Sequence, residues 1–154
     1  MKKIIAGLAL ATVAFAGSVS AQDAPFAKEI KARQGIMVYR ALNIGVLGAM
    51  AKGEAEYNAE AAQKAADALV ASTKLDVSML YVPGSSNAEN PASTVKPEVF
   101  TEDVGIGAKA ADFNAAAEAM QVAAGTGLDG LKAAMGALGK SCGGCHEVSR
   151  IPQN

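Results

Sequence analysis

Every thiol of the 154-residue sequence, and its one imidazole, lies within five consecutive positions near the end of the chain. Residues 142–146 read CGGCH, a C-x-x-C-H motif. Residues three and four apart share one face of a helix, so Cys142, Cys145 and His146 can point to the same side. This motif is the attachment signature of haem c. It predicts one covalently attached haem c per chain, with Cys142 and Cys145 as thioether positions and His146 as an iron ligand.

Three other kinds of site use cysteine and histidine at such spacings. A structural zinc site takes four ligands, and the sequence offers two thiols and one imidazole. A thioredoxin-like centre places its C-x-x-C near a βαβ pattern, which this sequence lacks. A disulfide between Cys142 and Cys145 would strain a helix and leave His146 without a role. Covalent haem attachment is therefore the favoured interpretation.

The first residues have the pattern of a secretory signal peptide. Two lysines precede an apolar stretch at residues 4–16, and small residues ending at Ala21 form a cleavage site. The stretch is too short for a membrane-spanning helix, which needs about 20 apolar residues. The sequence thus divides into a signal peptide, residues 1–21, and one domain, residues 22–154. We expect a periplasmic protein, in an oxidising compartment where two unbonded thiols would not persist.

The composition of the expected mature domain favours helix and disfavours several partners. Its 28 alanines are the best helix formers, but alanine buries little surface and leaves room for a bulky apolar group. Without the two signal-peptide lysines, 12 of the 14 basic residues remain against 15 acidic ones, a formal charge of −3. The basic residues are scattered, so no nucleic-acid partner is expected. A second apolar span is missing, so the domain is not expected to be membrane-embedded.

Four helical segments are expected to position the motif, at residues 25–51, 58–75, 98–124 and 126–145. Two of the three links are short, which makes neighbouring helices antiparallel. The expected fold class is therefore all-α, an up-down antiparallel four-helix bundle with covalently bound haem. The third link, residues 76–97, is long and rich in proline and serine, and such connections are usually functional or mobile.

Local signals mark the helix boundaries and the inward faces. Gly53 is expected to end the first helix, Asn58 to cap the second, and Thr126 with Asp129 to form a capping box before the fourth. Two glycines weaken the first half of the third helix. The first helix is expected to face inward at Ile30, Gln34, Met37, Ala41, Ile44, Gly48 and Ala51. The inward seam of the fourth is expected at Leu128, Leu131, Met135, Leu138, Cys142 and Cys145.

The sequence resembles the class II c-type cytochromes, the family of cytochrome c′ and its low-spin, methionine-ligated relatives. The resemblance is carried by KARQGIM (31–37), GAMAKGE (48–54), VKPEVF (95–100) and LKAAMGALGKSCGGCHEVSR (131–150). It implies a periplasmic monohaem protein that carries single electrons between redox proteins. The alternative that it implies is binding of nitric oxide or carbon monoxide at a five-coordinate iron. It implies no enzymatic turnover, and members are often homodimers packed through their first two helices.

Met37 is the first candidate for a second axial ligand. His146 is the only imidazole, so a second histidine from the same chain is excluded. Met37 lies roughly 16 Å into the first helix, facing the expected position of the motif, whereas Met50 is almost two turns further along. Met79, in the long link, is a weaker candidate. The family pattern also implies Met37, which either binds the iron or only covers it and leaves a site for gases.

The resemblance gives roles to three further residues. Arg33 and Gln34 match the family's paired polar residues near the haem propionates, and a guanidinium suits a carboxylate through its planar fork. Arg150 matches the family's basic residue beside the proximal histidine, where its charge would tune the reduction potential. No role for Arg40 follows from the sequence.

Overall fold

The computed structural model describes residues 24–152, and the expected signal peptide, residues 1–21, lies outside the described residues. Its helices are α1 (Ala27–Lys52), α2 (Ala59–Thr73), the 3-10 turn η1 (Ser78–Leu80), α3 (Glu98–Thr101), α4 (Ile106–Ala124) and α5 (Leu128–Ser149). Within residues 24–152 the only β-type pairing is an isolated bridge between Val95 and Arg150. No helix in this part of the chain is long and apolar enough to cross a bilayer.

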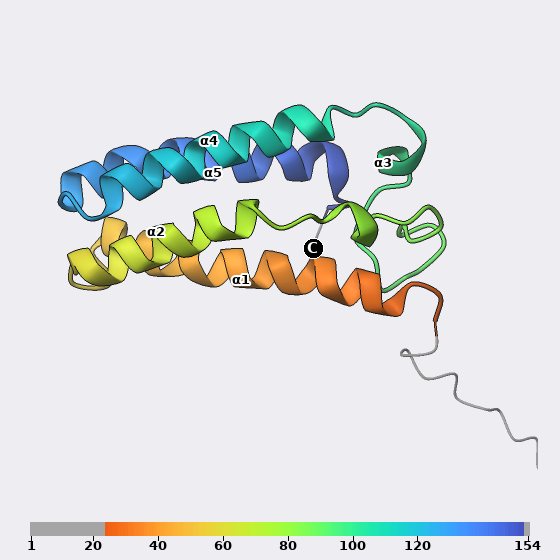
Figure 1. Cartoon of the computed structure of the whole chain (residues 1–154), viewed down its shortest axis with the longest axis horizontal. Coiled ribbons are helices and arrows are strands. Elements are labelled where there is room, and N and C mark those ends of the chain that lie inside the picture. The colour runs from red at the N-terminus through yellow and green to blue at the C-terminus, as the bar shows by residue number, and fades with distance from the viewer. Residues whose placement is uncertain (1–23, 153–154) are drawn as a thin grey trace, which may run out of the picture.

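The four long helices form an up-down antiparallel bundle (Figure 1). α1 contacts α2 and α5, α2 contacts α4, and α4 contacts α5, so the helices close into a ring around one core. The two short turns, residues 53–58 and 125–127, lie together at what we call the turn end. The start of α1, the last turns of α5 and the connection 76–97 lie at the opposite end, which we call the motif end. The expected all-α four-helix bundle is confirmed.

Two of the expected helix boundaries are confirmed. Gly53 follows α1 with φ +76°, a left-handed conformation that glycine adopts without a Cβ clash, and its N–H donates to the Met50 carbonyl at 3.1 Å. The Asn58 side chain accepts a hydrogen bond from the Ala61 N–H at 2.9 Å and caps α2.

Two other boundaries were predicted wrongly. The expected helix over residues 98–124 is divided into α3 and α4. The backbone becomes extended at Glu102, directly after α3, and Gly105 adopts a left-handed φ of +73° just before α4. The capping box is absent from the start of α5, where Gly127 occupies the N-cap. The Thr126 hydroxyl instead donates to the Ala123 carbonyl at 2.8 Å, in the last turn of α4.

Small side chains dominate the core. Alanines from α2 and α4 lie between a few leucines and methionines, and they let the helices approach closely. The buried members of the cluster are Leu47, Met50, Ala62, Ala65, Ala66, Leu69, Phe113, Ala116, Ala117, Met120, Ala124, Leu131 and Leu138. The expected inward seam of α5 is confirmed, with both cysteines partly buried at its end.

The inward face of α1 differs from the expected one. Gln34 and Ala41 are exposed, whereas Arg33 is buried and Arg40 is half-buried. The buried or partly buried positions at this spacing are Ile30, Arg33, Arg40, Ile44 and Leu47. Met37 is exposed, but its spacing of four residues from Arg33 places it on the same face. The expected positions Gln34 and Ala41 are each one residue away from the observed arginines, because charged side chains rarely face a core and arginine was not expected there.

Candidate functional site

The end of α5 carries Cys142, Cys145 and His146, all partly buried. The helix is continuous through the two glycines between the cysteines, so the three side chains keep their helical spacing. Both cysteines are unpaired thiols. Burial raises the pKa of the Cys142 thiol, and a hydrogen bond with Ser141 and the charge of Arg40 oppose this in part.

The packing of α1 against α5 fixes which residues face each other. A Cβ atom on Gly48 would lie 3.8 Å from the terminal methyl carbon of Met135, so these residues are in register. The helices run antiparallel, and each rises about 1.5 Å per residue. Met37 precedes Gly48 by eleven residues, and His146 follows Met135 by eleven. Met37 and His146 are therefore at about the same level of the bundle.

The core is incomplete at this level. On the inward face of α1, Ile30 is 2 % exposed, Arg33 5 % and Leu47 0 %, but Met37 is 39 % exposed. Met37 shares this face because it lies four residues after Arg33. The protein's own side chains thus leave Met37 accessible where the cysteine motif lies on α5.

Arg33 holds the long connection in place. Its Nη1 donates to the Leu80 carbonyl at 2.6 Å and the Ser85 hydroxyl at 2.7 Å. Its Nη2 donates to the Ser85 carbonyl at 2.9 Å and the Ser93 hydroxyl at 3.2 Å. The guanidinium also lies 5.2 Å from the centroid of the Tyr81 ring, and burial lowers the pKa of Arg33. These four bonds direct both Nη atoms of Arg33 to the connection.

Gln34 contacts the same connection from the exposed side of α1. Its Nε2 donates to the Ala92 carbonyl at 2.8 Å. Buried polar residues of the connection stabilise the arrangement, since Asn90 donates to the Pro25 carbonyl at 2.9 Å. Arg33 and Gln34 thus lie together at the motif end, and both donate hydrogen bonds to residues of the connection 76–97.

The connection is also tied to the end of α5. Val95 and Arg150 form the isolated bridge beside His146. The Lys96 backbone N–H and its ammonium group donate to carbonyls in the last turn of α5, at 2.9 and 2.7 Å. These bonds fix the end of the helix that carries His146 and place Arg150 one turn beyond it.

The surroundings of His146 favour its neutral form. Burial lowers the pKa of His146, and the charge of Arg150 lowers it further. A neutral imidazole is the form that ligates a metal. A groove of about 390 Å³ runs beside His146 and is also lined by Lys96, Arg150 and Pro152.

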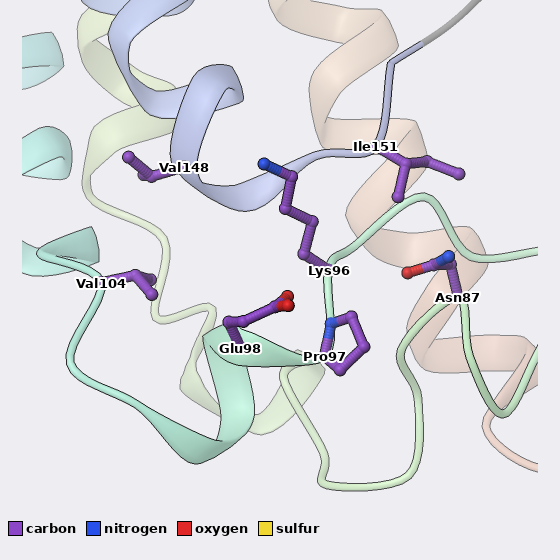
Figure 2. A pocket seen from close by; sticks show the side chains of 7 residues that line it. All are labelled: Asn87, Lys96, Pro97, Glu98, Val104, Val148 and Ile151. Atoms are coloured by element: carbon purple, nitrogen blue, oxygen red, sulfur yellow. The ribbon is translucent and has the colours of Figure 1, made fainter.

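A larger surface pocket of about 660 Å³ adjoins this groove (Figure 2). Lys96, Pro97 and Glu98 form one side of it, and Val148 and Ile151 lie across from them. Lys96 and Ile151 also line the groove beside His146. None of the cysteine, histidine or methionine residues of the motif end lines this pocket, so the chemistry of the site lies outside it.

Arg40 is the site residue that sequence reasoning missed. Its Nε donates to the Ser72 hydroxyl at 2.9 Å, and its Nη2 donates to the Ser72 carbonyl at 3.0 Å. The guanidinium lies 4.6 Å from the centroid of the Phe113 ring. The available signal was the seven-residue spacing from Arg33, which puts both arginines on the face that carries Met37.

The residues present fit a covalently attached haem. Two unpaired thiols at helical spacing offer thioether positions, and the adjacent neutral imidazole offers an axial nitrogen. Met37, at about the level of the motif, is 39 % exposed and is not covered by the protein's own side chains. Among residues 24–152 no three His, Cys, Asp or Glu side chains converge, so a closed zinc site lacks ligands.

Known proteins are similar to this chain in sequence and fold. A family model described as Cytochrome C′ matches residues 28–150. A cytochrome c′ of Cereibacter sphaeroides is 39 % identical over 92 % of this chain and 95 % of its own length. A cytochrome c-554 of the same species is 39 % identical over 95 % of this chain and 96 % of its own. A solved cytochrome c′ from a Rhodobacter species has a TM-score of 0.81 and 38 % identity, covering 84 % of this chain and 100 % of the other.

Proposed function

Because the chain belongs to the cytochrome c′ family, we propose that it carries single electrons between periplasmic redox proteins. The family binds covalent haem c with iron, and Cys142 and Cys145 are the thiols available for the attachment. When bound, the haem supplies a one-electron couple between ferric and ferrous iron. This role converts no substrate, so we assign the protein no enzymatic activity.

The observation that supports an electron carrier most directly is the register of α1 against α5. Met37 and His146 are at about the same level, and Met37 is accessible on the inward face of α1. A methionine thioether opposite a histidine stabilises the ferrous state and raises the reduction potential. We therefore propose Met37 as the second axial ligand.

Absorption spectra of the matured protein test this ligation. We expect the ferric wild type to be low-spin and to have the far-red band of a sulfur-to-iron bond. Met37→Leu conserves volume and should remove the band, whereas the control Met50→Leu, on the same helix but 6 % exposed in the core, should keep it. A high-spin wild type without the band would contradict the proposal.

Gas binding is the second candidate function. Its support is that Met37 is 39 % exposed, so packing alone does not hold its thioether in place. If Met37 only covers the iron, the chain would bind nitric oxide or carbon monoxide at a five-coordinate site. Titration of the ferrous protein with carbon monoxide separates the two functions. Ready binding by the wild type would favour the gas-binding protein, and binding seen only in Met37→Leu would favour the electron carrier.

We propose that the mature domain starts at Gln22 in the periplasm. The first support is the signal-peptide pattern of residues 1–21. The second is that the two cysteines would be protected from oxidation in the periplasm by their thioether bonds to the haem. Sequencing the N-terminus of protein recovered from the periplasmic fraction tests this. An uncleaved chain retained in the cytoplasm would contradict it.

We also propose a homodimer packed through α1. The outward face of this helix presents Val38, Leu42 and Val46, which are 59 %, 67 % and 41 % exposed and four residues apart. A second copy with the same stripe would cover them through a two-fold interface. Leu42→Glu should give monomers in analytical ultracentrifugation with an unchanged haem spectrum. The control Val122→Glu, on α4, should remain dimeric, and a monomeric wild type would refute the proposal.

A further inference from the structure

Arg40 carries a charge that has no acidic partner among residues 24–152. The three ion pairs among the described residues all join exposed lysines to carboxylates, and none includes Arg40. Its partners are neutral, namely the hydroxyl and carbonyl of Ser72 and the ring of Phe113. Burial lowers the pKa of Arg40, but a guanidinium keeps its positive charge in proteins.

Three elements hold this charge in one position. α1 carries the side chain, Ser72 at the end of α2 fixes two of its nitrogen atoms, and Phe113 of α4 supports the guanidinium plane. A guanidinium bound in this way keeps its place, whereas an exposed lysine samples many rotamers. A half-buried charge is also screened less by salt than an exposed one.

The same helix register brings Arg40 to the level of the cysteine motif. Arg40 precedes Gly48 by eight residues, and Gly143 follows Met135 by eight. The charge therefore lies at the level of the segment between Cys142 and Cys145. The electrostatic influence of Cys142 and Cys145 raises the pKa of Arg40, which agrees with this proximity.

We propose that Arg40 raises the reduction potential of the haem by holding a fixed positive charge beside the attachment site. This inference rests on the proposed haem attachment, but not on the ligation by Met37. Ferric haem carries one more positive charge than ferrous haem, so a neighbouring cation disfavours the ferric form. A unit charge within about 10 Å, at an effective dielectric constant of about 20, shifts the equilibrium between them by about tenfold.

Redox titration of the matured protein, followed by its absorption spectrum, tests the proposal. Arg40→Gln should shift the equilibrium about tenfold toward the ferric form, a midpoint potential about 59 mV lower for a one-electron couple. Arg40→Lys retains the charge and should keep most of the potential, although it loses the stacking on Phe113. The control Lys132→Gln removes an equal charge from an exposed position of α5, about 20 Å along the helix from His146, and should change the equilibrium less than twofold.

The outcomes separate a charge effect from a structural one. If Arg40→Gln and Arg40→Lys lower the melting temperature equally but leave the potential unchanged, Arg40 is structural only and the inference is wrong. An equal fall of the potential in both variants would also overturn it, because the lysine keeps the charge. The absorption spectrum of the wild type is recorded before the titration and shows whether haem is attached. A spectrum without haem bands would refute the proposed function together with this inference.

Discussion

The turn end and the motif end of the bundle are filled by different kinds of side chain. At the turn end the core is apolar and closed, with 0 % exposure at Ala62, Ala117, Met120, Ala124 and Leu131. At the motif end the inward positions hold two arginines, two thiols and an exposed methionine. The connection that covers this end buries polar residues, with Ser85, Ser86, Asn90 and Ser93 at most 5 % exposed.

This difference shows how one bundle can combine helix packing with a cofactor site. Alanine-rich helices approach closely at the turn end, where two short links join them in pairs. The motif end cannot close in this way, because the guanidinium groups of Arg33 and Arg40 require polar partners when they are buried. The apolar surface missing beside Met37 is the surface that an attached haem would supply.

The largest effect on stability is expected at the turn end. Leu131→Ala removes a fully buried side chain between α4 and α5 and should lower the free energy of unfolding by about 2–5 kcal/mol. Urea denaturation measures this loss. The ferric spectrum under native conditions should stay that of the wild type, because the mutation lies about four turns from His146. A changed spectrum would mean that the two ends are not independent.

At the motif end, Arg33→Gln should have a smaller and more local effect. The variant leaves the buried hydroxyls of Ser85 and Ser93 without their donor, at a cost of about 1.5–3 kcal/mol. Hydrogen exchange should accelerate in residues 80–95 and stay unchanged in α2 and α4. The exposed control Lys31→Gln should alter neither, and unchanged exchange over residues 80–95 in Arg33→Gln would show that Arg33 does not hold the connection.

The smallest effect is expected from Asp67, on the exposed surface between α2 and α4. Hydrogen bonds from Gln121 and Gln63, both 2.9 Å, lower the pKa of Asp67. Its contribution to stability is therefore present above about pH 4 and is lost as the pH falls through the lowered pKa. Between about pH 6 and about pH 3, the melting temperature of the wild type should fall slightly more than that of Asp67→Asn. Parallel pH profiles would exclude this contribution.

Much of the turn end could be predicted from the sequence, because local chemistry decides it. Gly53 ends a helix by adopting a left-handed conformation, and Asn58 caps the next helix through its side chain. The role of Thr126 was predicted wrongly because its hydroxyl can serve either helix that flanks this short turn. It was expected to accept from an N–H at the start of α5, but it donates to the Ala123 carbonyl at the end of α4. The periodicity of α2, α4 and α5 followed from apolar residues at helical spacing.

At the motif end, only the features that depend on residues close together in the sequence could be predicted. Cys142, Cys145 and His146 identify their chemistry by spacing alone. The inward direction of Arg33 and Arg40 depends on acceptors from the connection and from α2, which are 32 to 60 residues away in sequence. The seven-residue spacing of the two arginines was the one local signal, and it does not identify partners so far away in the sequence. Gln34 and Ala41 were therefore expected on the inward face in place of Arg33 and Arg40.

One measurement tests the central claim directly, namely the intact mass of the purified, exported protein together with its ferric spectrum. We expect a chain that starts at Gln22 and is heavier than its amino acids by one haem, bound so firmly that it remains after denaturation. A colourless protein with the mass of the polypeptide alone would contradict covalent attachment at Cys142 and Cys145.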